Sequence, residues 1–260
     1  MPAIPGFSLA ARLRAGEIVH SAWCGLGAPI VAEMIARDGF NTVTLDAQHG
    51  LWDFAAMRDA IVAIRAGGAS PMVRVALNDF GTVSRLLDVG CEGIIAPFIN
   101  TAEDARAFAA VAKYPPLGER SFGPMRAMTL TGIADPRDYV SQANDNVVAL
   151  AMIETRAAVD NIEAIAATPG IDGLFLGPVD MSLTLSGGKT LDADAPDVDR
   201  VLERILKATK ATGKIAGTYC FEAEHAAAFE KRGVRFFLIA SDTAFLRGGT
   251  SAALKALQGR

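Results

Sequence analysis

Residues 42–50 read Thr-Val-Thr-Leu-Asp-Ala-Gln-His-Gly, an apolar strand that stops in polar side chains and a glycine. The segment Thr42 to Asp46 has the β-branched, apolar composition of a buried strand. In parallel α/β proteins, titratable groups such as Asp46 and His49 carry the chemistry when they begin the loop after a strand. We interpret this stretch as one part of a functional site, to which the fold brings other parts.

The same strand-then-helix unit recurs along the chain. Eight strands are predicted, at Ile18 to Trp23, Thr42 to Asp46, Met72 to Val75, Gly93 to Pro97, Val147 to Ile153, Asp172 to Leu176, Ile215 to Thr218 and Arg235 to Ala240. Helices are predicted after the first four at Pro29 to Arg37, Phe54 to Ala66, Asp79 to Val89 and Ala102 to Lys113. Each later strand is also followed by a helix candidate. Strands of this kind, without a hairpin between neighbours, favour an α/β fold: a closed (β/α)8 TIM barrel in which residues 1–260 form a single domain.

An open, doubly wound sheet is the alternative. Such a fold usually has a glycine-rich first turn that binds a nucleotide. The first turn here is Cys24-Gly25-Leu26-Gly27-Ala28-Pro29, which lacks the third glycine and the downstream acid. The barrel is therefore the preferred prediction.

Two segments lie outside the repeated unit. Residues 7–15 have the apolar spacing of a short amphipathic helix, which we expect to close one end of the core. Residues 113–146 are predicted to be irregular, except for a small helix at Asp135 to Asn144. A segment this long in a compact domain is typical of a functional loop or an interaction arm.

The composition excludes several classes of protein. The net charge is −4 and no basic run is present, so no nucleic-acid partner is expected. The three cysteines are scattered, which predicts neither disulfides nor a zinc cluster. Met1 to Pro5 do not begin a signal peptide, and no stretch is apolar enough to span a membrane. A cytoplasmic protein that acts on small molecules is the resulting prediction.

A barrel gathers the carboxyl ends of its strands at one mouth. We expect the following residues there: Trp23, Asp46, Gln48, His49, Arg74, Pro97, Glu154, Asp180, Thr218 and Ser241-Asp242. Each has a simpler explanation by itself. Asp46 and Asp180 could cap helices, His49 could be a surface residue and Arg74 could belong to a structural ion pair.

Glu154 ends an otherwise apolar strand, where a charge is costly unless it is paired or binds a metal. Asp180 follows the next strand, so the two carboxylates could share one cation. Two oxygen ligands with open positions suit Mg²⁺ or Mn²⁺. Two separate helix caps are the alternative.

Acid–base and anion-binding groups complete the predicted site. His49 is the natural acid/base, and Asp46 could fix its tautomer, with Asp88 as a second candidate for that role. Arg74, inside an apolar strand, suits a substrate carboxylate or a developing enolate oxygen. The free amides of Gly177-Pro178-Val179, at the start of a short helix, could bind a carboxylate, or the segment could be a simple turn.

The positions of the lysines bear on a different mechanism, in which the substrate forms an imine with a desolvated lysine in the pocket. Lys214 precedes a strand at the wrong end of the barrel. The others lie in loops or on helices, where we expect them to be solvated: Lys113, Lys189, Lys207, Lys210, Lys231 and Lys255. Imine chemistry is therefore not predicted.

The motifs of this chain resemble those of the HpcH/HpaI aldolase family, metal-dependent class II pyruvate aldolases of the phosphoenolpyruvate/pyruvate superfamily. The resemblance extends over nearly the whole chain. It rests on Leu45-Asp46-Ala47-Gln48-His49, Val73-Arg74, Leu86-Leu87-Asp88-Val89-Gly90, Tyr114-Pro115-Pro116-x-Gly118-x-Arg120, Ile153-Glu154-Thr155 and Gly177-Pro178-x-Asp180-x-Ser182.

The resemblance implies a TIM barrel assembled as a hexamer of two trimers, with the last helix exchanged between subunits. It implies that Glu154 and Asp180 bind the metal, that His49 is the base, supported by Asp46 and Asp88, and that Arg74 holds the pyruvate oxygen. Arg120 would approach an active-site mouth, its own or a neighbour's.

The predicted reaction joins the enolate of pyruvate, or of a related 2-oxo acid, to an aldehyde and gives 4-hydroxy-2-oxo acids, or cleaves them. Mg²⁺ or Mn²⁺ is expected, with Co²⁺, Ni²⁺ and Zn²⁺ as further candidates. Two positions depart from the family, because Gln48 replaces its usual acid and Met152 replaces a frequent glutamine. The alternatives are a citryl-CoA-type or phosphonopyruvate-type enzyme and a non-catalytic barrel that senses 2-oxo acids.

Overall fold

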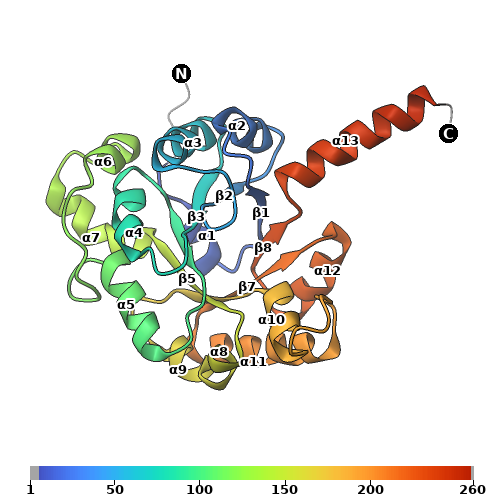
Figure 1. Cartoon of the computed structure of the whole chain (residues 1–260). Coiled ribbons are helices and arrows are strands. Elements are labelled where there is room, and N and C mark those ends of the chain that lie inside the picture. The colour runs from blue at the N-terminus through green and yellow to red at the C-terminus, as the bar shows by residue number, and fades with distance from the viewer. Residues whose placement is uncertain (1–5, 259–260) are drawn as a thin grey trace.

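The chain forms a closed barrel of eight parallel strands in sequence order, in a computed structural model that describes residues 6–258 (Figure 1). The strands are β1 (Val19–Cys24), β2 (Thr42–Asp46), β3 (Ser70–Arg74), β4 (Gly93–Ala96), β5 (Val148–Ile153), β6 (Gly173–Leu176), β7 (Ile215–Cys220) and β8 (Phe236–Ile239). The ring closes where β1 pairs with β8, with Val19 opposite Phe236. The (β/α)8 prediction is confirmed.

Helices surround the barrel and connect its strands (Figure 1). Their bounds are α1 (Leu9–Arg14), α2 (Pro29–Arg37), α3 (Phe54–Ala66), α4 (Phe80–Asp88), α5 (Ala102–Ala112), α6 (Met125–Thr131), α7 (Pro136–Asn146), α8 (Arg156–Asp160), α9 (Ile162–Ala167), α10 (Pro178–Leu185), α11 (Pro196–Thr212), α12 (Ala223–Arg232) and α13 (Asp242–Leu257). Within the described residues, no helix is long and apolar enough to cross a membrane. The prediction about Met1 to Pro5 lies outside the described residues.

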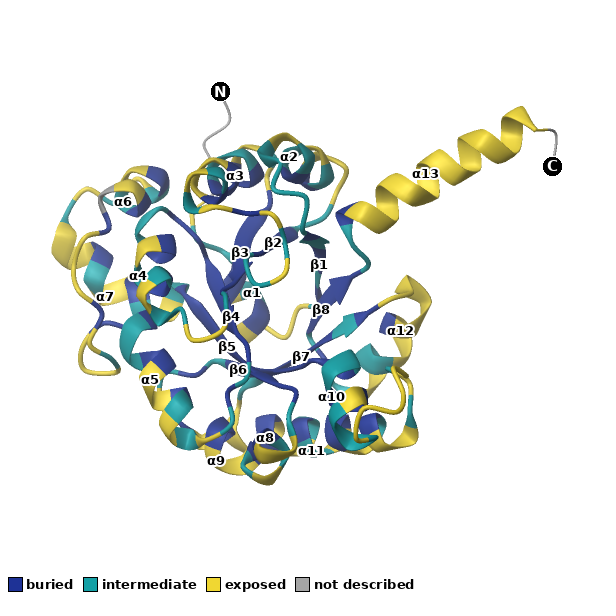
Figure 2. Ribbon diagram, viewed as in Figure 1, coloured by how far each residue is buried: buried dark blue, intermediate teal, exposed yellow. Residues whose placement is uncertain are grey.

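The strands are apolar throughout because both of their faces are covered. All six residues of β5 are buried. Leu150 and Met152 point into the barrel interior, whereas Ala149 and Ala151 pack with the layer between the strands and the helices. This alternation follows from the two-residue period of a strand. The strands appear as a buried ring in Figure 2.

Helix α1 closes the amino-terminal end of the barrel, as predicted. Leu9 and Leu13 pack with interior side chains from several strands. Glu92 fixes the start of the helix, because its Oε2 accepts the N–H groups of Ser8 (2.9 Å) and Leu9 (3.0 Å). Its Oε1 accepts from Arg65 at 2.6 Å, with both side chains almost completely buried. This network holds the bottom of the barrel together.

The prediction that Lys113 is solvated is wrong. Its Nζ is buried and donates to the carbonyls of Asn144 and Val147, at 2.8 and 2.7 Å, and pairs with Asp172 at 2.8 Å. Lys214 is half-buried and donates to the Thr168 carbonyl at 2.6 Å. Burial lowers the pKa of Lys214, more than nearby Asp172 raises it. Both lysines lie at the amino-terminal end of the barrel, so neither reaches the mouth.

Residues 113–146 contain more helix than predicted. Helix α7 was expected, but α6 was missed. The two helices pack through an aromatic cluster that includes Tyr114 and Tyr139, both buried. Their own small core explains why such a long insertion is ordered.

Helix α13 projects away from the barrel, and almost all of it is exposed (Figure 2). Asp242, its first residue, is its only buried residue. Leu257 is 85% exposed, and Leu246 and Leu254 are also exposed. The helix thus presents apolar side chains to the surroundings of this chain.

Candidate active site

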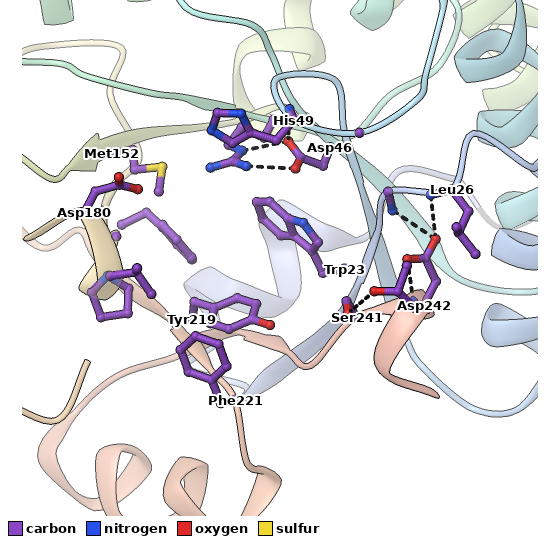
Figure 3. Close-up of a pocket in the computed structure, with 18 of the residues that line it drawn as sticks. Trp23, Leu26, Asp46, His49, Met152, Asp180, Tyr219, Phe221, Ser241 and Asp242 are labelled. Atoms are coloured by element: carbon purple, nitrogen blue, oxygen red, sulfur yellow. Dashed lines mark hydrogen bonds and ion pairs between the residues drawn. The ribbon is translucent and has the colours of Figure 1, made fainter. Parts of the chain in front are cut away.

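A cavity of about 490 Å³ opens at the carboxyl ends of the strands (Figure 3). Side chains at or just beyond the ends of several strands line it, among them Trp23, Asp46, Arg74, Met152, Tyr219 and Ser241. Residues far apart in sequence therefore share one space, as the barrel topology requires.

Asp46 and Arg74 form a buried, two-pronged ion pair at this mouth. They are direct neighbours across β2 and β3. Arg74 donates from Nε to Asp46 Oδ1 and from Nη2 to Oδ2, both at 2.8 Å. The Trp23 ring lies against the guanidinium, 4.4 Å from Cζ to the ring centroid. Because the pair is bidentate and stacked, the direction of the guanidinium is fixed.

His49 lies beside this pair on the loop that follows β2 (Figure 3). Asp46 Oδ1 accepts the N–H of Gln48 at 3.2 Å and weakly that of His49 at 3.4 Å. Gly50 is required, because a Cβ there would lie 2.3 Å from the Asp46 carbonyl oxygen. The backbone of the loop is thus folded around Asp46, and the His49 side chain stays accessible.

Asp46 was expected to fix the tautomer of His49, but it makes no hydrogen bond to the imidazole among the described residues. Its carboxylate bonds instead to Arg74 and to loop amides. The strand register explains this, because it places Asp46 directly opposite Arg74. Gln48 does not line the cavity, and its buried Oε1 has no partner within the described part of the chain.

Glu154 lies at the end of β5 and is 1% exposed. Its Oε1 accepts the Phe98 N–H at 2.9 Å. Its pKa is raised to about 7, mainly by burial and less by the nearby Asp180 carboxylate, although the Phe98 N–H and Arg74 act in the opposite direction. A cation beside these two carboxylates would offset both burial and repulsion.

Gly177 separates Glu154 from the open cavity. A Cβ on Gly177 would lie 2.8 Å from Glu154 Oε2 and 2.6 Å from Met152 Cε. Asp180, in the first turn of α10, lines the cavity itself, whereas Glu154 lies just behind the wall. Glycine at this position therefore leaves room for a group to contact both carboxylates.

The residues fit a hard divalent cation. No group of three or more His, Cys, Asp or Glu side chains suited to a metal occurs in residues 6–258. Glu154 and Asp180 would supply two oxygen ligands, and water and substrate would supply the rest. This is how Mg²⁺ is usually bound in proteins.

The start of α10 offers fewer amides than predicted. The Gly177 N–H already donates to the Ile153 carbonyl at 3.1 Å, and Pro178 has no N–H. In the described part of the chain, the Val179 N–H has no partner. All three residues line the cavity, but of their amides Val179 alone is free to bind a ligand.

Asp88 and Arg120 are not brought to this cavity. Arg120 donates to Asp88 Oδ1 at 2.6 Å, and its guanidinium lies over the Tyr114 ring, 4.6 Å from the centroid. The pair belongs to the lobe of α4, α6 and α7, because Asp88 ends α4 and Arg120 lies over Tyr114 of the aromatic cluster there. Any contact of these residues with a substrate must occur at another site.

Two aromatic residues of the cavity were missed, Tyr219 and Phe221. Their rings meet edge to face, 4.8 Å apart between centroids, and Tyr219 also meets Trp23 at 6.0 Å. The predicted seventh strand ended at Thr218, but β7 continues to Cys220. The alternation of aromatic and small residues over positions 218–221 was the available signal.

Comparison with known proteins agrees with the fold. The family model for HpcH/HpaI aldolase/citrate lyase matches residues 21–248. A hydroxypyruvate/pyruvate aldolase of Rhizorhabdus wittichii is 38% identical, over 89% of this chain and 90% of that one. A 5-keto-4-deoxy-D-glucarate aldolase of Klebsiella pneumoniae is 33% identical, over 92% of each chain. The crystal structure of an HpcH/HpaI aldolase of Desulfitobacterium hafniense superposes with a TM-score of 0.89 at 29% identity, over 96% of each chain.

The family match and the aldolase relatives define this barrel protein as a lyase of the pyruvate-aldolase type, an enzyme that acts on carbon–carbon bonds. The chain belongs to the HpcH/HpaI aldolase/citrate lyase family.

Proposed function

We propose that this protein uses a divalent metal ion to join pyruvate, or a related 2-oxo acid, to an aldehyde, and to cleave the resulting 4-hydroxy-2-oxo acid. The observation that carries this proposal is the buried Glu154. Its raised pKa and the nearby Asp180 carboxylate support a bound cation at this place, near the Arg74 guanidinium.

Glu154 and Asp180 would hold the metal, which we expect to be Mg²⁺ or Mn²⁺, with Co²⁺, Ni²⁺ and Zn²⁺ as further candidates. Once bound, the ion would polarise the 2-oxo group as a Lewis acid and acidify the neighbouring methyl group. Met152, next to both Gly177 and the cavity, brings a thioether rather than a second polar group to this side.

Arg74 would stabilise the negative charge that develops on the oxo oxygen during proton removal. Asp46 is a positioning residue here, since its two hydrogen bonds fix the guanidinium. The Val179 N–H would bind the substrate carboxylate, and Gly177 and Pro178 would shape the wall around it.

His49 would move the proton. It lines the cavity on an accessible loop, and an imidazole exchanges protons readily near neutral pH. Trp23 would cover the reacting carbons, because its ring lies against Arg74 within the cavity.

We further propose that Asp88 and Arg120 act in the active site of a neighbouring subunit of a cytoplasmic homo-oligomer, a hexamer of two trimers with exchanged α13 helices. The apolar residues of α13 are exposed in a single chain, which supports a partner there. Mixing inactive His49→Ala with inactive Asp88→Ala protein should restore activity through mixed subunits. Absence of restoration after subunit exchange would contradict a shared site.

The central experiment follows the methyl protons of pyruvate in deuterated water by NMR, with the full-length protein and no aldehyde. We expect rapid exchange with Mg²⁺ and none after EDTA treatment. Asp180→Asn should slow exchange by at least about a hundredfold, because Lewis-acid stabilisation is worth several kcal/mol. Asp59→Asn, which removes an exposed carboxylate paired with Arg58, is the matched control and should not change the rate.

Unchanged exchange in EDTA would overturn the metal requirement. Absence of exchange with all five candidate metals would overturn the proposed donor chemistry. The cavity does not favour a CoA ester, because Arg74 and His49 are the only basic residues among the described residues that line it. CoA esters call for several cations on the rim.

A further inference from the structure

A second cavity of about 190 Å³ lies behind the wall of the first. Pro178, Tyr219 and Phe221 line both cavities, so these three side chains form the partition between them. The second cavity is mainly apolar, with Val198, Leu202 and Phe229 among its walls. It is therefore suited to a hydrocarbon chain.

The partition is a column of rings on the side of Trp23 that faces away from His49 and Asp46 (Figure 3). The Tyr219 hydroxyl donates to the Ala240 carbonyl at 3.1 Å, which fixes the tyrosine ring. Phe221 packs edge to face on that ring, yet it is 53% exposed. Tyr219 is thus a fixed wall, and Phe221 ends the wall at the mouth.

The charges around the partition disfavour an acidic ligand. The basic groups among the described residues that line either cavity are His49, Arg74 and His225. Arg74 is bonded twice to Asp46, and the His225 imidazole lies 3.8 Å from an Asp194 carboxylate oxygen. Among the described residues that line the two cavities, no unpaired arginine or lysine would meet a carboxylate on the far end of an aldehyde.

We infer that Tyr219 and Phe221 limit the length of the acceptor, so that the enzyme uses a short, uncharged aldehyde. The inference rests on the proposed function, in which the metal side of the cavity holds the 2-oxo acid. The aldehyde then lies against the Trp23 and Tyr219 rings, which contact each other edge to face, and a longer hydrocarbon chain collides with Phe221. Replacing Phe221 by a small residue opens the partition, so that the hydrocarbon chain of the aldehyde can extend into the second cavity.

The test compares kcat/KM for propanal, heptanal and succinic semialdehyde, with pyruvate and Mg²⁺. The wild-type protein should favour propanal over both other aldehydes by at least about tenfold. Phe221→Ala should raise the heptanal-to-propanal ratio by at least about tenfold, because each methylene buried in an apolar pocket contributes about fourfold. Leu191→Ala, an exposed apolar residue that lines neither cavity, is the control and should keep the wild-type ratio.

A second variant locates the aldehyde chain. Val198→Phe fills the second cavity, so adding it to Phe221→Ala should abolish the gain for heptanal. A gain that persists in the double variant would overturn the second cavity as the tail site. An unchanged ratio in Phe221→Ala, or a wild-type preference for either longer aldehyde, would overturn the length limit.

Pyruvate proton exchange without aldehyde is measured on every variant, as a separate reading of the donor step. Exchange that persists while the acceptor ratios fail to move refutes only the role of Phe221. Absence of exchange in the wild-type protein refutes the proposed function and this inference with it.

Discussion

The two ends of the barrel each bury a carboxylate, Glu92 at the amino-terminal end and Glu154 at the carboxyl-terminal end. Glu92 accepts from Arg65, from two backbone N–H groups and from Ser70. Glu154 accepts one backbone N–H and lies near a second acid, Asp180. The two side chains are equally buried, but of the two carboxylates only that of Glu92 is paired with a cation. The network around Glu92 at the amino-terminal end therefore stabilises the fold. At the carboxyl-terminal end, Glu154 keeps carboxylate lone pairs that could accept a further ligand.

The largest effect on stability is expected when the hydrogen-bond network of Glu92, at the amino-terminal end of the barrel, is broken. Glu92→Ala should lower the free energy of unfolding by about 3–5 kcal/mol, because it leaves Arg65 buried without its carboxylate. Denaturant titration measures the change. Glu17→Ala removes an exposed ion pair with Arg12 and should cost less than about 1 kcal/mol. Equal losses in the two variants would remove the distinction between a paired core and a surface contact.

Substitution of Glu154, at the carboxyl-terminal end of the barrel, should affect activity rather than stability. Glu154→Gln keeps the shape of the side chain but removes a proposed metal ligand. We expect a loss of about 3 kcal/mol or more of transition-state stabilisation, a fall in kcat/KM of at least about a hundredfold. The unfolding free energy in EDTA should not fall. If Glu154→Gln lowered the free energy of unfolding as much as Glu92→Ala, both carboxylates would have the same structural role.

The pH dependence of stability sharpens the contrast. The folded-state pKa of Glu154 is raised from 4.5 to about 7, so the folded protein binds a proton more tightly than the unfolded chain. In EDTA, this group should lower the unfolding free energy by up to about 3 kcal/mol as the pH rises from about 4.5 through 7. Subtracting the same curve for Glu154→Gln isolates the contribution. A difference curve without this fall would contradict the buried, unpaired state of Glu154.

The smallest effect is expected at Gly177. Gly177→Ala would place a methyl group against Met152 and Glu154, at a cost of about 1–3 kcal/mol in stability. Metal affinity, measured by calorimetry, should fall as Glu154 is displaced. Gly248→Ala, where an added methyl meets nothing within 4 Å, is the control and should stabilise α13 slightly. Unaltered metal affinity in Gly177→Ala would show that Glu154 does not need this space.

Much of the fold follows from sequence because a parallel barrel repeats one pattern. All eight strands were predicted, since burial on both faces makes each an apolar run. The missed helix α6 lies in the lobe outside this repeat, where its residues pack on Tyr114 and Tyr139 rather than on the barrel. The burial of Lys113 also depends on partners distant in sequence, Asn144, Val147 and Asp172.

The candidate site was predictable in its residues but not in their pairings. Strand ends identified five residues as neighbours: Asp46, His49, Arg74, Glu154 and Asp180. The structure places four of them in the wall of the cavity and Glu154 just behind it. Register decides that Asp46 faces Arg74, and register cannot be derived from apolar patterning alone. Asp88 and Arg120 bond to each other away from the cavity, and a pairing between residues 32 positions apart is not encoded in any local pattern.

Closure of the ring has a consequence for how the chain folds. The pairing of β1 with β8 joins Val19 to Phe236, nearly the two ends of the described chain. Until that contact forms, two strand edges stay open, and contacts this distant in sequence form slowly. The barrel therefore closes only when β8 is available to pair with β1, and the open strand edges before that point favour aggregation.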